Sequence, residues 1–159
     1  MYKKIVAFLG SAFFFWGVWV VSIFQSMWLA ITARYPMAFD EAYHYDVIRL
    51  HAKQWSPIFL EQPAGKAPYG ALVRDPSYIY HYLMSLPYRL FSSLGLGEHM
   101  TIVSLRFISL TMFAYGLFLF RKLLQKTHAS DAAINTAILF FIMIPTVPLL
   151  AGELNYDSL

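Results

Sequence analysis

The sequence predicts an all-α integral membrane protein with about three transmembrane helices and interfacial helices in a long outer loop. Of the 159 residues, 58% are apolar and only 13% are charged, whereas soluble domains carry roughly 25% charged residues. Three long segments carry one charge at most, and about 20 apolar residues suffice for a helix to cross a bilayer. We therefore predict a single membrane domain over residues 1–159, with spans at about 5–33, 101–120 and 132–151 and the outer loop at 34–100.

The charge and cysteine content argue against a nucleic-acid partner and exclude any site that needs cysteine. The formal net charge is only +3, and no run of lysine or arginine indicates a nucleic-acid partner. The chain contains no cysteine, so it forms neither a disulfide nor a metal-thiolate site.

The first uncharged segment, residues 5–33, is predicted to be a retained transmembrane helix. It contains 29 residues, whereas the apolar region of a cleaved signal peptide has only about 7–15. A helix of this length either tilts in the bilayer or emerges from it at one end.

Two helices are predicted in the outer loop. The first covers residues 40–55, and Ser56-Pro57 ends it. The second begins at Asp75-Pro76, an N-cap acid followed by a proline, and ends near Leu94 because Gly95 follows. Its many tyrosines predict that it lies flat in the membrane interface, with packing against a partner helix as the alternative.

The other two spans define the topology. The span at 101–120 carries Arg106 as its only charge, and we expect this side chain to snorkel to the headgroups. Prolines at 145 and 148 should distort the end of the span at 132–151. Five bases begin the chain or follow the second span: Lys3, Lys4, Arg121, Lys122 and Lys126. By the positive-inside rule they place the N-terminus in the cytoplasm and the outer loop on the opposite face.

A cluster of acids, tyrosines and a histidine, FDEAYHYD at residues 39–46, directly follows the first span. One interpretation is structural, since Asp40 suits an N-cap and Glu41 suits the first turn of a helix. The other is that a carboxylate at the membrane surface acts as a general base or metal ligand. A second acidic segment, GELNYDSL, follows the third span on the same predicted face. We therefore expect Asp40 and Asp157 to converge on one cavity.

The order of these motifs resembles the amino-terminal part of the GT-C membrane glycosyltransferases, above all the protein O-mannosyltransferase and lipid A aminoarabinose transferase type. The matching motifs, in chain order, are FDEAYHYD, PSYIYHYL, RFIS and NYDSL. The resemblance implies transfer of a sugar from a polyprenyl-phosphate donor to an acceptor glycan, lipid or protein at the non-cytoplasmic side of the cell membrane. It also implies an amino-terminal piece of a longer enzyme, which alone would turn nothing over.

The resemblance also implies roles for particular residues. Asp40 would be the catalytic base or a metal ligand, Glu41 its catalytic neighbour, and Asp157 the later loop acid. A divalent metal ion is the one cofactor that such a site could hold, because the carboxylates of Asp40 and Asp157 suit a hard cation. The residues expected to bind substrate are Tyr43, His44, Lys66, Arg74, Arg106 and Asp157.

Some of these residues also have simpler interpretations. Lys66 and Arg74 are either solvated charges or partners of a lipid phosphate. Asp40 and His44 lie four apart and could share a helix face, although an acid with one histidine is weak evidence of a metal.

Two other functions agree with the composition. A non-catalytic membrane scaffold needs aromatic interfacial helices but no acids. A small transporter component needs polar residues at membrane depth, and Gln25 and Arg106 are too few for a conduction path.

Overall fold

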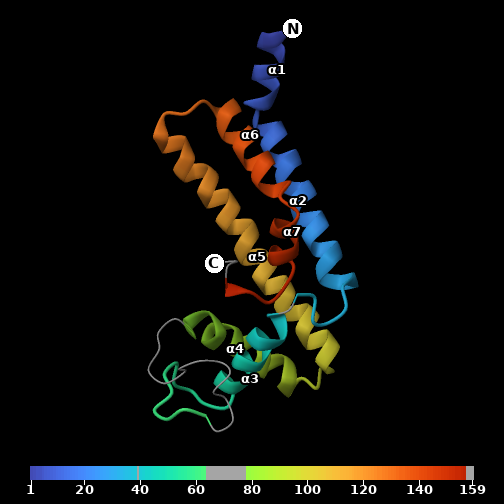
Figure 1. The fold of residues 1–159 in the computed structure, drawn as a ribbon, viewed down its shortest axis with the longest axis vertical. Coiled ribbons are helices and arrows are strands. Elements are labelled where there is room, and N and C mark those ends of the chain that lie inside the picture. The colour runs from blue at the N-terminus through green and yellow to red at the C-terminus, as the bar shows by residue number, and fades with distance from the viewer. Residues whose placement is uncertain (39, 64–77, 157–159) are drawn as a thin grey trace. The chain divides into compact units, whose positions relative to one another are not determined.

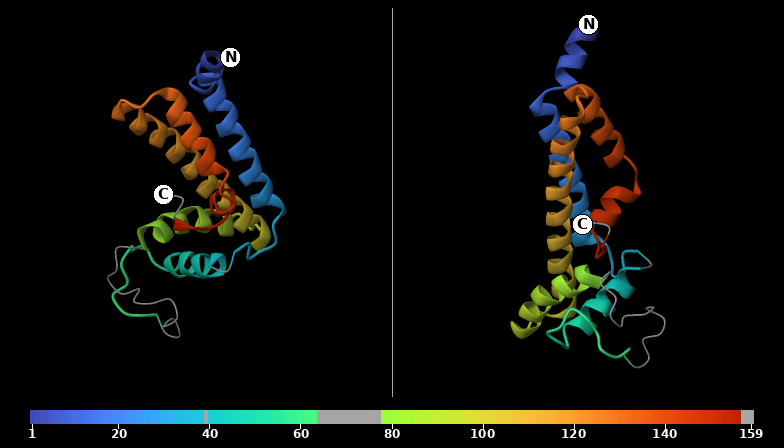
Figure 2. Two further views of the ribbon diagram at one scale, coloured as in Figure 1. Left: turned by 45° about the horizontal axis from the view of Figure 1, so that its top comes forward. Right: turned by 90° about the vertical axis from the view of Figure 1, so that its left-hand side faces the viewer.

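The computed structural model describes residues 1–38, 40–63 and 78–156, and the regular elements in these ranges are all helices. Figure 1 labels them, and Figure 2 shows the same ribbon from two further sides. The predicted all-α class is therefore confirmed. The helices form two compact units, the first from residues 1–32 and 107–153 and the second from residues 33–106 and 154–156.

The predicted first span, residues 5–33, is interrupted rather than continuous. Helix α1 covers Tyr2–Leu9 and α2 covers Ala12–Thr32. Between them, the Ser11 hydroxyl accepts a hydrogen bond from the Phe14 amide at 3.1 Å, which is the bond that an N-cap serine makes. A capping serine begins a new helix, so the prediction of one helix over 5–33 is wrong.

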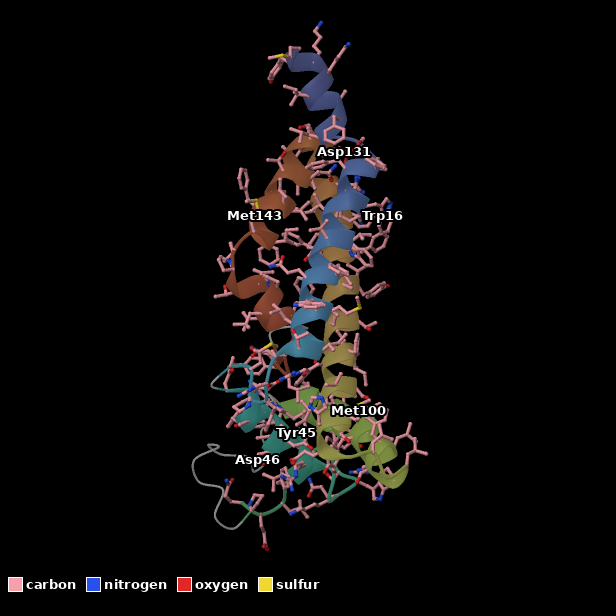
Figure 3. All side chains as sticks on the ribbon, turned by 90° about the vertical axis from the view of Figure 1, so that its right-hand side faces the viewer. Trp16, Tyr45, Asp46, Met100, Asp131 and Met143 are labelled. Atoms are coloured by element: carbon pink, nitrogen blue, oxygen red, sulfur yellow. The ribbon has the colours of Figure 1, made fainter. Side chains whose placement is uncertain are left out.

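Two of the described helices, α2 and α5, are long and apolar enough to cross a membrane. Helix α5 covers Glu98–Leu124, and the 3-10 turn η3, Gln125–Thr127, extends it, so it exceeds the predicted bounds of 101–120 at both ends. The predicted third span is divided into α6, Asp131–Ile142, and α7, Thr146–Ala151. Met143, labelled in Figure 3, is the residue at which α6 ends, two residues before Pro145. Neither piece alone reaches the length of about 20 residues that a span needs.

Side chains from α2, α5 and α6 form the core of the first unit. Helix α7 approaches α2 closely, because α2 presents small buried residues at a spacing of four: Ser22, Ser26 and Ala30. A side-chain carbon added at Gly152 would lie only 2.8 Å from the Ser26 carbonyl oxygen. This contact therefore depends on small residues on both sides, as helix contacts in membranes often do.

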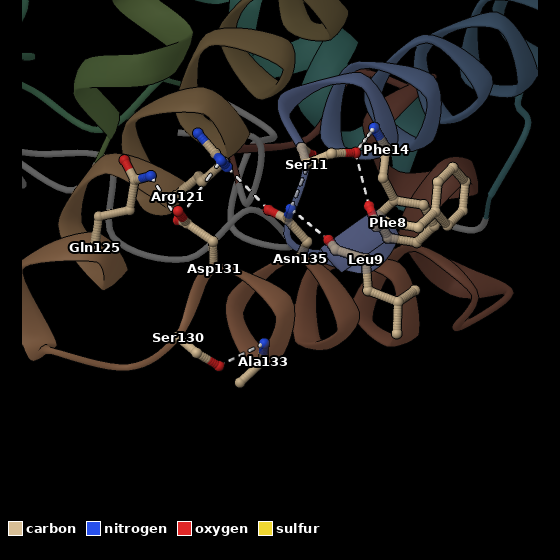
Figure 4. Close-up of polar contacts among 10 residues, drawn as sticks. All are labelled: Phe8, Leu9, Ser11, Phe14, Arg121, Gln125, Ser130, Asp131, Ala133 and Asn135. Carbon is tan, nitrogen blue, oxygen red and sulfur yellow. Dashed lines mark hydrogen bonds and ion pairs between the residues drawn. The ribbon is translucent and has the colours of Figure 1, made fainter. Parts of the chain in front are cut away.

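Asn135 satisfies the backbone carbonyls that the break between α1 and α2 exposes (Figure 4). Its Nδ2 donates to the carbonyl oxygens of Leu9 at 2.8 Å and Ser11 at 3.3 Å. Its Oδ1 accepts a hydrogen bond from Arg121 Nε at 3.0 Å, and Arg121 also lies 3.8 Å from Asp131. The buried amide thus holds the end of α1, the end of α5 and the start of α6 together.

The second unit contains α3, Glu41–His51, and α4, Ile79–Ser93, which pack against each other. Helix α3 ends earlier than the predicted residue 55. Arg89 of α4 donates hydrogen bonds to the carbonyls of His51, at 2.8 Å, and Gln54, and its guanidinium lies 4.0 Å from the centre of the Trp55 ring. A side chain from another helix therefore satisfies the backbone where α3 ends.

Glycine ends α4, as predicted. Gly95 has a φ of +73°, a conformation that favours glycine. The Leu96 amide donates to the Phe91 carbonyl and the Gly95 amide to the Ser92 carbonyl, both at 3.1 Å, which is the Schellman pattern. The predicted helix start at Asp75-Pro76 lies outside the described residues.

Candidate functional site

The second unit is built around an ion pair between Glu41, the first residue of α3, and Arg106 of α5. Arg106 Nε donates to Glu41 Oε1 and Arg106 Nη2 to Glu41 Oε2, each at 2.7 Å. The side chains are 1% and 0% exposed respectively. A bidentate pair of this kind is the strongest form of charge-assisted hydrogen bonding between side chains.

Both members of this pair make further hydrogen bonds to the backbone. Glu41 Oε2 accepts from the Met37 amide at 2.6 Å and Oε1 from the Leu154 amide at 3.4 Å. Arg106 Nη1 donates to the Ala33 carbonyl at 3.1 Å. The expectation that Arg106 snorkels to the headgroups is therefore wrong, because its buried charge is neutralised within the protein. These contacts give Glu41 a structural role, and its part in catalysis stays a prediction.

Asp40, in contrast, makes no capping contact. It occupies the N-cap position of α3, yet its side chain accepts no hydrogen bond from the first turn. Its side chain is 32% exposed, and Oδ2 lies 3.7 Å from Nε2 of His44. Asp40 is thus the N-cap residue that the structural interpretation expects, but its side chain does not cap the helix, and its carboxylate remains partly accessible beside a buried histidine.

His44 pairs with a second histidine, His81 of α4. Nδ1 of His44 and Nε2 of His81 are 2.8 Å apart, and the two rings stack with their centres 5.1 Å apart. Both side chains are 2% exposed. The ring of Tyr156 packs edge-on against His44 with a centre-to-centre distance of 5.2 Å. Asp40, His44 and His81 therefore form a row that leads from a half-buried carboxylate into the protein.

Two tyrosine hydroxyls lie next to this row. Tyr43 and Tyr78 share a hydrogen bond of 3.0 Å between their hydroxyl groups. Their rings also contact the histidines, Tyr43 on His44 at 5.1 Å and Tyr78 on His81 at 5.4 Å between ring centres. The predicted substrate ligand Tyr43 is thus adjacent to the Asp40 row.

Burial keeps two histidines, His81 and His51, neutral. It lowers the pKa of His81 to about 3, with smaller contributions from His44 and His51. Burial likewise lowers the pKa of His51 to about 4, and the nearby Arg89 charge adds to the effect. Near neutral pH both rings are therefore uncharged imidazoles, each with one donor and one acceptor nitrogen.

The other predicted site residues are only partly covered by the structure. Lys66, Arg74 and Asp157 lie outside the described residues. The segment just before Asp157 does reach the site, through the Leu154 amide on Glu41 and the Tyr156 ring on His44. Among the described side chains, no three His, Asp or Glu residues gather where they could hold a metal ion. The metal site of Asp40 and Asp157 stays a prediction.

Sequence reasoning missed the partners that complete the site. His81 is part of the PSYIYHYL motif, but its spacing of 37 residues from His44 gives no local sign that the two rings meet. Arg106 is 65 residues from Glu41. The available signal was the position of Arg106 inside an apolar span, because a charge there is costly and usually has a partner of opposite charge.

Comparison with known proteins found no match. No family model matches the chain, and no curated protein or solved structure matches it significantly.

Proposed function

We propose that this chain belongs to a membrane glycosyltransferase of the GT-C type, which transfers a sugar from a polyprenyl-phosphate donor to an acceptor at the non-cytoplasmic face of the cell membrane. The main support for the proposal is the environment of the Asp40 side chain. This carboxylate is half-buried, with 32% of the side chain exposed, makes no capping bond at a position where aspartate normally does, and lies beside a buried histidine pair. A carboxylate that makes no capping bond and is partly open to solvent is suited to accept a proton from a substrate.

In the proposed reaction, the Asp40 carboxylate takes the proton of the acceptor hydroxyl or amine while the acceptor atom bonds to the anomeric carbon. The bond from that carbon to the phosphate oxygen breaks, and the polyprenyl phosphate leaves with the electron pair. Cations stabilise the charge on the departing phosphate. We assign this role to Lys66 and Arg74 rather than Arg106, because the guanidinium of Arg106 is already engaged by Glu41.

The surface of the first unit supports a membrane location. Large apolar side chains are exposed along α2: Phe13, Trp16, Val20, Val21, Phe24, Trp28 and Ile31. Trp16, labelled in Figure 3, projects outward from this helix. Apolar patches of this extent are rare on soluble monomers. We further propose that α6 and α7 together make the third crossing, with the interruption between them covered by protein rather than by lipid.

We propose that α4 lies in the membrane interface. Its exposed apolar side chains follow a helical spacing and so form one stripe: Ile79, Leu83, Leu86, Leu90 and Leu94. The opposite side of the helix packs on α3 through buried residues that include Tyr80 and His81. A helix with one face on protein and the other apolar is suited to lie at headgroup depth.

The proposed topology is testable because the chain has no cysteine of its own. We expect Ala42→Cys and Ser158→Cys, made singly, to react with a membrane-impermeant thiol reagent added to intact cells. The matched control is Ala129→Cys, in the exposed turn between α5 and α6, which should react only after the cells are opened. Labelling of Ala42→Cys solely in opened cells would refute the non-cytoplasmic site.

The proposed activity is tested with membranes from cells that carry the natural gene and from cells that lack it. Only the former should transfer labelled sugar from a polyprenyl-phosphate donor to endogenous acceptor. A scaffold or transporter component would leave transfer equal in the two membranes once donor and acceptor are both supplied, and that result would reject the enzyme.

A further inference from the structure

The hydrogen bond between His44 and His81 has a direction that the surrounding groups determine. We propose that His81 is a positioning residue: it donates from Nε2 to His44 Nδ1 and thereby directs the Nε2–H of His44 toward the Asp40 carboxylate. The tautomer assignment depends on the positions of the two rings and on a neutral His81, whereas its consequence for catalysis rests on the proposed function.

The 2.8 Å bond between Nδ1 of His44 and Nε2 of His81 contains one proton. If His44 donates, the proton of neutral His81 lies on its Nδ1, and an uncharged His44 would carry its lone pair on Nε2. If His81 donates, His81 Nδ1 carries the lone pair and His44 carries its proton on Nε2. In each ring, the hydrogen bond made by one nitrogen therefore determines whether the second nitrogen carries a proton or a lone pair.

The inner end of the row favours donation by His81. His81 Nδ1 is buried and has no hydrogen-bond partner among the described residues. Among buried backbone groups, an N–H without an acceptor is rarer than a carbonyl without a donor, and we extend this preference to the ring nitrogens of His81. The proton of neutral His81 therefore belongs on Nε2, in the bond to His44.

The outer end of the row favours the same arrangement. Asp40 Oδ2 lies 3.7 Å from His44 Nε2. A lone pair on Nε2 would repel the carboxylate, whereas an N–H directed toward it is attractive. Two independent observations, at opposite ends of the row, thus select one tautomer of both rings.

This arrangement would orient Asp40. The N–H of His44 attracts Oδ2 and so limits the rotation of the carboxyl group, which leaves the other oxygen for the acceptor proton. His81 itself is 2% exposed and would touch no substrate. Its effect on the reaction would pass through His44, in the way that outer partners fix the tautomer of metal-binding histidines.

The assignment is tested by nitrogen-15 NMR of the purified chain with labelled histidine in lipid nanodiscs, near neutral pH. The signals of His44 are identified by their loss in His44→Gln, and His99→Gln, at an exposed histidine, serves as the control. We expect His44 to be protonated on Nε2 and unprotonated on Nδ1. The reverse pattern would overturn the proposal.

Two variants connect the tautomer to activity. His81→Leu removes the donor, so His44 should populate both tautomers, and transfer in cell membranes should fall by about 10- to 100-fold, the usual cost of losing an outer partner. His81→Gln can still donate an amide N–H and should retain the tautomer and most of the transfer. Unchanged transfer in His81→Leu, or equal losses in both variants, would overturn the positioning role. Absence of transfer by the natural protein would instead reject the proposed function, while the NMR result would still stand.

Discussion

Arg106→Met is expected to destabilise the second unit by about 3–5 kcal/mol, because it leaves the Glu41 carboxylate buried without its partner. Glu41 is 0% exposed, and the arginine supplies two of its hydrogen bonds. The two backbone amides that remain, from Met37 and Leu154, cannot neutralise its charge. Thermal unfolding of the purified chain in detergent, with hydrogen exchange of the α3 amides, measures the loss.

The matched control for this variant is Arg49→Met. Arg49 also pairs with an acid, Asp46, at 3.7 Å, and contacts the Tyr45 ring and the Tyr88 hydroxyl, but the side chains of Arg49 and Asp46 are 50% and 36% exposed. Exposed pairs contribute at most about 1 kcal/mol, so this change should leave unfolding and exchange nearly as they are. The comparison separates loss of a charge from loss of a buried partner.

A double variant, Glu41→Met with Arg106→Met, is expected to recover most of the stability, since it removes both buried charges at once. Replacement of a buried ion pair by apolar side chains is often neutral or stabilising. A double variant as unstable as Arg106→Met alone would contradict this account and would show that the amide contacts of Glu41, rather than its charge, hold the unit.

Asp40→Asn is expected to reduce sugar transfer by about 10²–10⁴-fold, the contribution typical of a positioned general base. The amide has nearly the same shape as the carboxylate but cannot accept the proton. Stability should be unchanged, because Asp40 makes no side-chain cap bond and asparagine also suits that position. Transfer is measured in membranes that contain equal amounts of each variant.

The control for Asp40→Asn is Asp46→Asn, which removes an equal charge from α3 at a residue that pairs with the exposed Arg49. It should transfer sugar at nearly the natural rate. Equal transfer by both variants and the natural protein would exclude Asp40 as the base and would leave a scaffold role for this chain.

The sequence by itself determined the helical class and several helix ends. Long apolar segments with at most one charge predicted α2 and α5, because a helix satisfies its own backbone where water is absent. Gly95 predicted the end of α4, because few other residues tolerate a positive φ. Pro145 and Pro148 predicted distortion of the third segment, which the structure divides into α6 and α7. Ser11 was an overlooked signal for the break before α2.

Only the tertiary structure decided which of the candidate residues are structural and which are accessible. Asp40 and Glu41 are neighbours in the sequence and both suit the start of a helix, yet one carboxylate is 32% exposed and the other is fully buried against Arg106. Successive residues at the start of a helix point in different directions, about 100° apart. Which direction faces the protein depends on where α5 lies, and the 65 residues between Glu41 and Arg106 contain no local pattern that specifies it. The contact between His44 and His81 could not be predicted for the same reason. A contact between two helices depends on how they pack and not on the residue spacing within either helix.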